Sequence, residues 1–157
     1  MKSQASWDRF YMDLAKKVAQ LSYAPDKKVG AVLVHPSGLV SFSYNGTVPG
    51  SCNCTTDEDG KTLDSVLHAE HNAIMKVCRT ALSTTGSTIY TTLSPCMGCA
   101  KMIYSGGVCR VVYEEPYKHG QEALNFLRQS GILVNQDIPH CQLFNQDQLK
   151  YTGLLND

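Results

Sequence analysis

The segment TLSPCMGCAKM, residues 92–102, decides how the rest of the chain is interpreted. It places two cysteines three positions apart, directly after a proline, where a helix is predicted to begin. A single C-x-x-C is compatible with half of a structural zinc site, with a redox dithiol, or with two of the three protein ligands of a catalytic zinc. Other residues of the chain must indicate which of these three kinds of site is present.

A second motif lies upstream, at the predicted start of another helix. His68 and Glu70 form an H-x-E element, and 24 residues separate Glu70 from the P-C-x-x-C segment. One imidazole and two thiolates give Zn²⁺ three protein ligands and leave a fourth position for water, which is typical of catalytic zinc. The combination H-x-E…P-C-x-x-C is the signature of zinc nucleobase deaminases. We therefore predict zinc ligation by His68, Cys96 and Cys99, with Glu70 as the proton shuttle.

Alternating helix and strand patterns surround these two motifs. A strand pair with a turn between its members predicts an antiparallel hairpin, and helical crossovers between the later strands predict parallel pairing. The result is an α/β fold with a mixed five-stranded sheet covered by helices on both faces. The predicted strands are 29–34, 39–44, 87–93, 108–114 and 132–136, and the predicted helices are 7–21, 65–79, 95–106 and 120–131.

Caps and apolar spacing set the expected helix ends and buried faces. Ser6 is the predicted N-cap of the first helix, Asp64 or Ser65 of the second and Ser94 of the third, with Gly106 as the stop signal. Two apolar stripes at helical spacing are predicted to face the core. The first consists of Trp7, Phe10, Tyr11, Leu14, Val18 and Leu21, and the second of Leu67, Ile74, Val77 and Ala81.

Length and composition bound the class of protein. The chain has 157 residues, of which 43% are apolar and 18% charged, so a single globular domain over residues 1–157 is expected. A formal net charge of zero argues against binding to long nucleic acids. The first residues do not resemble a signal peptide and no window has transmembrane length, which predicts a cytoplasmic protein. Seven cysteines in a reducing compartment favour free thiols and metal ligation over disulfides.

Five segments resemble the deoxycytidylate (dCMP) deaminases over roughly residues 7 to 140. The resemblance implies a cytidine deaminase-like three-layer α/β/α sandwich that hydrolyses dCMP to dUMP and ammonia for thymidylate synthesis. It also implies a homohexamer activated by dCTP and inhibited by dTTP, each with Mg²⁺. The short chain suggests a phage or bacterial member, acting in the host cytoplasm if viral. The segments are VGAVLV (29–34), SYNGTVPG (43–50), LHAEHNAI (67–74), YTTLSPCMGCAKMIYSGGVCRVVYEE (90–115) and YKHGQEALNFLRQSGI (117–132).

The same resemblance implies roles for residues beyond the zinc motif. Asn45 corresponds to the residue that contacts the sugar hydroxyl, although an asparagine before a glycine is also a common turn residue. Ala69 and Ser94 flank the zinc ligands, so their backbone groups can face the base. Tyr117 corresponds to a pocket-lining position, with a solvent-exposed loop tyrosine as the alternative. The effector loop corresponds to Tyr44, Gly46, Thr47, Pro49 and Gly50, with a plain flexible loop as the alternative.

The chain also departs from the family pattern. Many relatives carry an arginine in the segment that here reads AQLSYAPDKKVGA (19–31), where Leu21 precedes Lys27 and Lys28. The residues that hold the substrate phosphate therefore stay open, and Lys118, His119 and Arg128 are either further candidates or surface charges. Cys52 and Cys54, with His35 as a distant third, are candidates for a second zinc, but free thiols are expected. Core or incidental thiols are expected at Cys78, Cys109 and Cys141.

Three alternatives to a dCMP deaminase remain. The first is a deaminase for another base, namely guanine, a riboflavin precursor or adenosine in tRNA. The second is a deaminase fold that has lost activity and serves as a zinc-stabilised interaction module, against which Glu70 argues. The third is a thiol redox protein that uses Cys96 and Cys99.

Overall fold

A computed structural model describes residues 3–137, which build a five-stranded sheet in the order β2-β1-β5-β6-β7. Strand β1 pairs antiparallel with both β2 and β5, whereas β5–β6 and β6–β7 are parallel. The prediction of a mixed five-stranded sheet is therefore confirmed. The strands are β1 (Gly30–Val34), β2 (Val40–Tyr44), β5 (Thr88–Leu93), β6 (Arg110–Glu115) and β7 (Leu133–Gln136).

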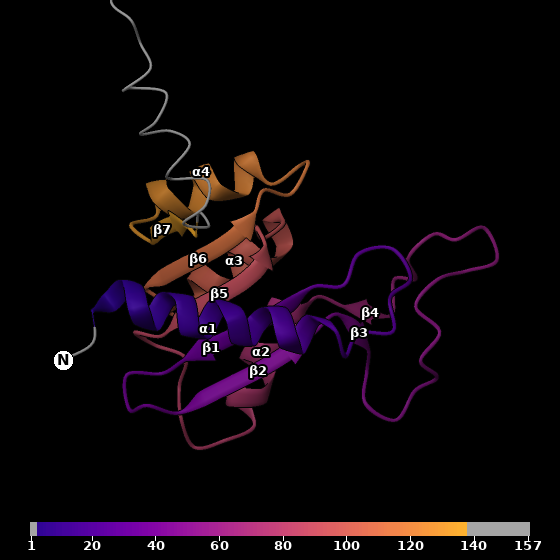
Figure 1. Cartoon of the computed structure of the whole chain (residues 1–157), viewed down its shortest axis with the longest axis horizontal. Helices are drawn as coiled ribbons and strands as arrows, with labels where there is room; N and C mark the ends of the chain where they lie inside the picture. The colour runs from indigo at the N-terminus through magenta and orange to yellow at the C-terminus, as the bar shows by residue number, and fades with distance from the viewer. Residues whose placement is uncertain (1–2, 138–157) are drawn as a thin grey trace, which may run out of the picture.

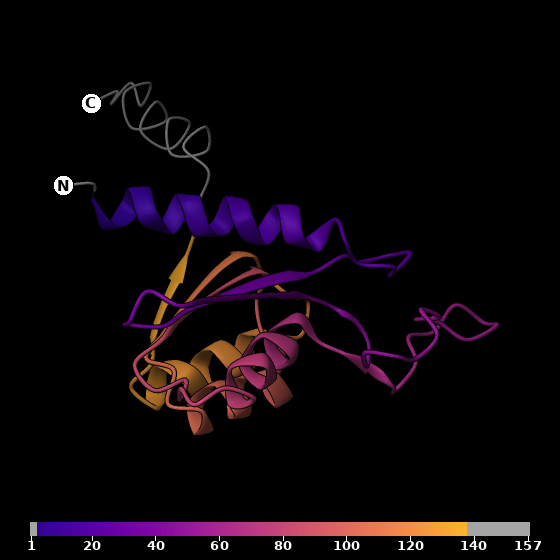
Figure 2. The ribbon, with the colours of Figure 1, turned by 90° about the horizontal axis from the view of Figure 1, so that it is seen from below.

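Helices cover both faces of this sheet, but unequally (Figures 1 and 2). Helix α1 (Gln4–Ala19) covers one face alone, and α2 (Ala69–Cys78), α3 (Met97–Ser105) and α4 (Gln121–Gln129) cover the other. Each interface has its own apolar core. The larger core joins α2, α3 and α4 to the sheet, and the smaller one joins α1 to the sheet. The three-layer α/β/α sandwich is confirmed.

The buried face of α1 differs from the predicted one. Trp7, Phe10 and Leu21 are 45%, 56% and 57% exposed, so they do not belong to the core. The helix lies so close to β1 that a Cβ atom at Gly30 would stand 2.0 Å from the Ala15 carbonyl oxygen. Small side chains and one flexible methionine fit this spacing better than aromatic rings. The residues of α1 that are buried are Met12, Ala15, Val18 and Ala19, and its N-cap is Ser3 rather than Ser6.

The two helices that carry the sequence motifs begin later than predicted. Helix α2 starts at Ala69 with His68 as its N-cap, and α3 starts at Met97 with Cys96 as its N-cap. The predicted caps Asp64, Ser65 and Ser94 therefore lie outside these helices. Ala81 follows the end of α2 and is exposed, so its predicted place in the core is wrong. Both helices thus begin at a predicted zinc ligand.

A short ribbon that the sequence did not predict precedes α2. Strand β3 (Gly46–Thr47) pairs antiparallel with β4 (Val66–Leu67), which ties together the two ends of the long loop over 48–65. Because β4 takes up residues 66 and 67, α2 cannot begin at residue 65. Within residues 3–137, no helix combines the length and apolar character needed to cross a membrane.

Candidate active site

Three predicted ligands meet at the N-termini of α2 and α3. The His68 Nδ1 atom lies 3.5 Å from the Cys96 Sγ and 3.4 Å from the Cys99 Sγ. All three potential ligand atoms lie within 4.8 Å of one another, and among the described residues this is the one such cluster of three or more metal-ligating side chains. The fold therefore brings together residues that are 28 and 31 positions apart in sequence.

These distances fit a tetrahedral zinc ion. Zinc bonds of about 2.0 Å to nitrogen and about 2.3 Å to sulfur separate the two ligand atoms by about 3.5 Å. One imidazole and two sulfurs provide three protein ligands, which leaves one position open for a small molecule. The donor set is soft and nitrogen-containing, and Zn²⁺ prefers such donors over Mg²⁺ or Ca²⁺.

The surroundings of Cys96 favour the thiolate form of its side chain. Hydrogen bonds with Cys99 and His68 lower the pKa of the Cys96 thiol to about 3. The Cys99 backbone N–H also donates to the Cys96 Sγ, at 3.5 Å, at the start of α3. Hydrogen bonding to Cys96 and burial raise the pKa of the Cys99 thiol. Two helix N-termini directed at the cluster further stabilise negative charge on it.

Glu70 lies in the first turn of α2, two residues after His68. Its residue surface is only 4% exposed, yet it lines the same cavity as His68 and Cys96. Burial raises the pKa of the Glu70 carboxyl to about 7. A carboxyl group with a pKa near neutrality can accept and return a proton at physiological pH.

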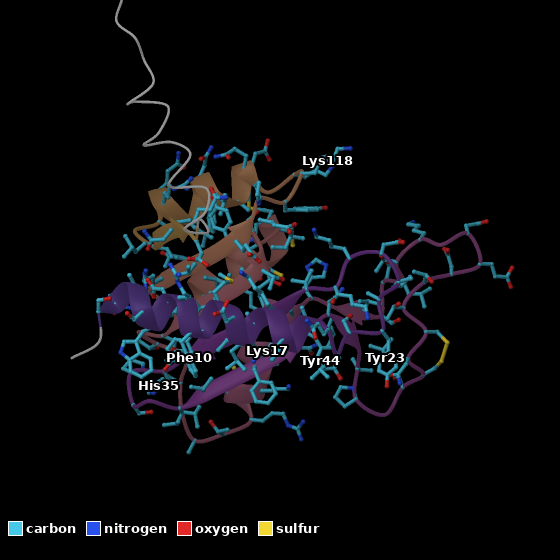
Figure 3. All side chains as sticks on the ribbon, in the orientation of Figure 1. Phe10, Lys17, Tyr23, His35, Tyr44 and Lys118 are labelled. Carbon is cyan, nitrogen blue, oxygen red and sulfur yellow. A yellow bond between two sulfur atoms is a disulfide. The ribbon has the colours of Figure 1, made fainter. Side chains whose placement is uncertain are left out.

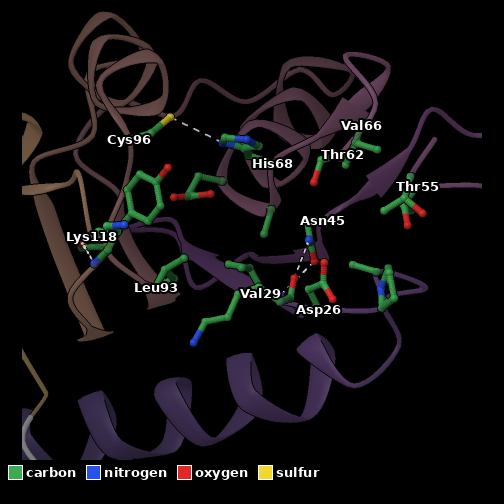
Figure 4. Close-up of a pocket in the computed structure, with 18 of the residues that line it drawn as sticks. Asp26, Val29, Asn45, Thr55, Thr62, Val66, His68, Leu93, Cys96 and Lys118 are labelled. Carbon is green, nitrogen blue, oxygen red and sulfur yellow. Dashed lines mark hydrogen bonds between the residues drawn. The ribbon is translucent and has the colours of Figure 1, made fainter. Parts of the chain in front are cut away.

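His68 and Cys96 of the cluster line a cavity of about 450 Å³ (Figure 4). This volume is in the range of small-molecule sites. The four residues predicted to contact the substrate, Asn45, Ala69, Ser94 and Tyr117, all line it. Lys118 lines it as well, whereas His119 packs edge-on against Tyr117 and Arg128 lies on α4, so neither is a lining residue.

Hydrogen bonds to backbone groups fix two of these lining residues. Asn45 accepts the Val29 N–H at 2.8 Å and donates to the Lys27 carbonyl at 2.9 Å, which fixes the segment before β1. Ser94 accepts the Tyr117 N–H at 2.7 Å through its hydroxyl and so links the C-terminal end of β5 to the loop after β6. After its two bonds to Val29 and Lys27, the side-chain amide of Asn45 keeps one N–H for donation and one lone pair for acceptance.

A second cavity of about 200 Å³ lies next to the first. The five predicted effector residues, Tyr44, Gly46, Thr47, Pro49 and Gly50, all line it. Tyr23, Asn72 and Lys76 line it too, and Figure 3 labels Tyr23 and Tyr44 near one another. The two cavities share Thr55, and both are bordered by residues of α2.

Two of the remaining cysteines differ from the expectation, and two agree with it. Cys52 and Cys54 are joined in a disulfide on the long loop (Figure 3), so the prediction of free thiols is wrong there. A local turn brings the two sulfurs together, as the hydrogen bond from the Cys54 N–H to the Cys52 Sγ shows. His35 is far from them and bonds to Ser37 in the β1–β2 turn. Free Cys78 and Cys109 are exposed and hence incidental, and Cys141 lies outside the described residues.

Sequence reasoning missed several lining residues of the larger cavity. The long loop contributes Thr55, Thr56 and Thr62, and the segment before β1 contributes Asp26. The polar composition of the loop indicated a functional segment without identifying the threonines. Asp26 carried no signal for a place in the cavity, because the path of the segment before β1 depends on the tertiary hydrogen bonds of Asn45.

Comparison with known proteins agrees with this geometry. Residues 5–115 match the sequence profile of the cytidine and deoxycytidylate deaminase zinc-binding region. The chain belongs to this family. The matched residues are the zinc-binding region of this family, and they contain His68, Cys96 and Cys99. The cofactor of this fold is therefore Zn²⁺.

Individual relatives extend the similarity to most of the chain. ComE operon protein 2 of Bacillus subtilis (strain 168) is 32% identical over 155 residues, which covers 94% of this chain and 82% of that protein. Deoxycytidylate deaminase of Saccharomyces cerevisiae is 32% identical over 140 residues, covering 83% of this chain but only 45% of the yeast protein. The dCMP deaminase of cyanophage S-TIM5, solved in complex with dCMP and dUMP, superimposes with a TM-score of 0.81 at 36% identity. That match covers 87% of this chain and 100% of the phage chain.

Proposed function

We propose that this family member is a dCMP deaminase, which hydrolyses dCMP to dUMP and ammonia and so supplies dUMP for thymidylate synthesis. The observation that carries this proposal is the position of His68 Nδ1 within 3.5 Å of both sulfurs, in one cavity with the buried Glu70. The phage relative that was solved with dCMP and dUMP supports the choice of substrate.

The proposed mechanism assigns proton transfer to Glu70. His68, Cys96 and Cys99 would hold a zinc ion, which would supply the Lewis acid that makes water nucleophilic near neutral pH. Glu70 accepts one proton of the attacking water and passes it to ring N3 while the water oxygen bonds to C4. Glu70 then transfers the remaining proton of that oxygen to the C4 amine, so the C4–N bond breaks, ammonia leaves and the C4 carbonyl of dUMP forms. Its pKa of about 7 suits transfer in both directions.

The other lining residues hold the substrate in this scheme. Asn45 has one donor and one acceptor left for a sugar hydroxyl, and the backbone groups of Ala69 and Ser94 stand beside the proposed ligands to meet the base. Tyr117 provides an aromatic wall whose backbone is fixed by Ser94. The cavity volume of about 450 Å³ admits a mononucleotide.

The alternative functions require different residues at the site. A zinc-stabilised interaction module does not require a buried carboxylate in the metal cavity, and a redox dithiol does not require a histidine within 3.5 Å of both sulfurs. A guanine, riboflavin-precursor or tRNA deaminase uses the same metal chemistry. The relatives named deoxycytidylate or dCMP deaminase favour dCMP as the substrate over guanine, a riboflavin precursor or tRNA.

Regulation by nucleoside triphosphates is the second part of the proposal. The smaller cavity would take dCTP as activator or dTTP as inhibitor, with Mg²⁺ on the phosphates. Lys76 offers a cation there, and the Gly46 and Gly50 positions let backbone N–H groups approach phosphate oxygens. Coupling would run through α2, because Asn72 donates to the Tyr44 carbonyl at 3.1 Å while His68 and Glu70 occupy the start of the same helix.

We further propose that residues 1–157 act as one deaminase domain and assemble as a homohexamer. Trp7 and Phe10, which are about half exposed and pack against each other, offer an apolar surface for self-association. Light scattering on a size-exclusion column tests the assembly, and a monomer at micromolar concentration would refute it.

A substrate panel tests the activity. Zinc-loaded protein is incubated with dCMP, deoxycytidine, dCTP, guanine and a tRNA, and the products are separated by chromatography. We expect dUMP from dCMP, suppression of that turnover by dTTP with Mg²⁺ and stimulation by dCTP. Turnover of another member of the panel in place of dCMP would refute the substrate, and indifference to both triphosphates would refute the regulation.

A further inference from the structure

One pair of neighbouring cysteines has no part in the His–Cys cluster. Cys52 and Cys54 are joined in a disulfide on the long loop. Both residues are exposed, and the S–S bond lies on the outer side of that loop (Figure 3). Within residues 3–137, no third metal-ligating side chain joins them in a cluster. The chemistry open to this pair is therefore thiol–disulfide exchange with a soluble thiol.

The disulfide constrains a segment that few other contacts fix. In the described part of the chain, no backbone–backbone hydrogen bond involves residues 52–54. The Cys54 N–H donates to the Cys52 Sγ at 3.3 Å, so this contact depends on a sulfur as well. A disulfide between residues so close in sequence closes a very small loop and adds little to the stability of the whole fold. Its main effect is on the path of residues 52–54.

Hydrogen bonds fix the chain on both sides of this segment. Before it, the Ser51 N–H donates to the Val48 carbonyl at 3.1 Å. After it, the Thr55 carbonyl accepts the Leu63 N–H at 3.0 Å. Opening the disulfide therefore gives residues 52–54 conformational freedom while the rest of the loop keeps its own contacts.

The constrained segment borders the smaller cavity. Ser51 and Asn53 line that cavity, and Thr55 lines both cavities. Asn53 stands between the two cysteines in sequence, so it belongs to the ring that the disulfide closes. A cavity wall that is already held in one conformation binds a ligand without the entropic cost of ordering it. The disulfide form is therefore expected to bind a ligand of the smaller cavity more tightly than the dithiol form.

We propose that Cys52 and Cys54 form a reversible redox site that adjusts the affinity of the smaller cavity for its effector. This inference rests on the effector site of the proposed function. It makes the regulation of the enzyme respond to the thiol–disulfide balance of its surroundings, and the zinc cluster takes no part in the exchange.

Glutathione supplies the electrons for reduction in this scheme. One glutathione thiolate attacks a sulfur of the disulfide and forms a mixed disulfide, while the other protein sulfur leaves as a thiolate and takes up a proton. A second glutathione thiolate attacks the glutathione sulfur of the mixed disulfide, which releases the second protein thiol and glutathione disulfide. Two electrons pass from two glutathione molecules to the protein pair, and glutathione disulfide reverses the reaction.

The test equilibrates the zinc-loaded full chain in buffers with different ratios of reduced glutathione to glutathione disulfide. The redox state is read from the mass of the peptide that contains both cysteines, after alkylation of free thiols. The probe for the smaller cavity is dTTP with Mg²⁺, whose Kd is measured by calorimetry. Hydrogen exchange at residues 52–54 reports on the loop without any ligand, and dCMP turnover without dTTP gives the basal activity.

Two variants accompany the wild type. Cys52→Ser cannot form the disulfide and so represents the open loop in every buffer. Cys109→Ser is the matched control, because Cys109 is a free, exposed cysteine that lines neither cavity. Zinc content and circular dichroism verify that both variants are folded and loaded.

We expect the oxidised wild type to bind dTTP about tenfold more tightly than the reduced wild type, which corresponds to ordering about one residue. Hydrogen exchange at residues 52–54 becomes faster on reduction. Cys52→Ser binds dTTP with the affinity of the reduced wild type at every glutathione ratio, and Cys109→Ser responds as the wild type does. Basal dCMP turnover differs by less than about twofold among all these forms.

Several results would overturn the redox site. One is a Cys52–Cys54 pair that keeps the same redox state at every glutathione ratio. Another is an equal Kd for dTTP in the oxidised and reduced wild type, and a third is a response that disappears in Cys109→Ser. If dTTP binds equally in both states, only this inference fails. A wild type that binds dTTP in neither state would refute the proposed regulation together with it.

Discussion

Gly46 pairs with Leu67 across the β3–β4 ribbon, and this pairing sets Asn45 and His68 at the same end of the molecule. Asn45 directly precedes β3 and His68 directly follows β4, so the ribbon brings the proposed sugar contact and the proposed zinc ligand to one cavity. The ribbon is therefore the element that connects the two halves of the site.

Asn45 supports both the fold around Lys27 and the proposed sugar contact. Asn45→Ala removes the hydrogen bonds to Val29 and Lys27. We expect kcat/KM for dCMP to fall by about 100-fold and the melting temperature to fall by several degrees, about 4 °C per kcal/mol lost. Asn125→Ala on the surface of α4 is the control. An Asn45→Ala protein with normal dCMP kinetics would remove Asn45 from the substrate site.

Replacement of Glu70 tests the proton shuttle. Glu70→Gln keeps the size and burial of the side chain but removes its ability to move protons. We expect kcat for dCMP to fall by about 10³-fold, with zinc content and circular dichroism unchanged. Glu122→Gln makes the same chemical change at an exposed position of α4 and should keep full turnover. Residual activity within tenfold of wild type in Glu70→Gln would contradict the shuttle role.

Replacement of one sulfur tests the metal site. Cys99→Ser replaces a buried proposed ligand whose Sγ lies 3.4 Å from the His68 Nδ1, and we expect zinc affinity to fall by at least about 100-fold. Metal content after dialysis against a weak chelator is the measurement. Cys109→Ser, at a free and exposed cysteine, should retain one zinc per chain. Equal zinc content in the two variants would take Cys99 off the ligand set.

The contact between α1 and β1 gives a prediction about stability. Gly30→Ala would place a Cβ atom 2.0 Å from the Ala15 carbonyl oxygen and 2.7 Å from the Ala19 nitrogen, both backbone atoms that cannot rotate away. We expect a loss of about 3 kcal/mol or more in the free energy of unfolding, measured with urea. Gly46→Ala, whose nearest neighbours are 3.6 Å away, is the control and should lose much less. Similar values for both would show that α1 can move away from the sheet.

The ion pair between Asp8 and Arg110 makes stability depend on pH. Two hydrogen bonds of 2.7 Å join the carboxylate to the guanidinium, and the Tyr90 hydroxyl donates a third. Burial alone would raise the pKa of Asp8, but these bonds outweigh it and lower the pKa. Since the folded-state pKa is below the unfolded one, the stabilisation is present above about pH 4 and disappears as the pH falls through the folded-state value.

Asp8→Asn should therefore cost about 3 kcal/mol at pH 7, because Arg110 stays partly buried without its counter-ion. The difference from wild type should shrink as the pH is lowered to about 3. Asp13→Asn, at an exposed carboxylate 4.0 Å from Lys16, should cost less than about 0.5 kcal/mol at either pH. A pH-independent cost for Asp8→Asn would contradict the ionic origin of the stabilisation.

Motif spacing and strand patterns predicted the mixed sheet and the residues that meet at the His–Cys cluster. They succeeded because H-x-E and C-x-x-C are local signals that each begin a helix, and parallel strands bring such helix starts to one edge. The buried face of α1 could not be predicted, since it depends on the close approach of Ala15 to Gly30. The β3–β4 ribbon was missed for another reason. Two-residue strands are too short to show a period, so the later start of α2 was missed with it.

The most direct test of the central claim is dCMP deamination as a function of bound zinc. Ammonia release is measured with the purified protein, then after removal of zinc with a chelator, and again after zinc is added back. We predict that turnover of dCMP is lost with the metal and returns in proportion to the zinc that rebinds. Turnover that persists in metal-free protein, or a zinc-loaded protein that releases no ammonia from dCMP, would contradict the account.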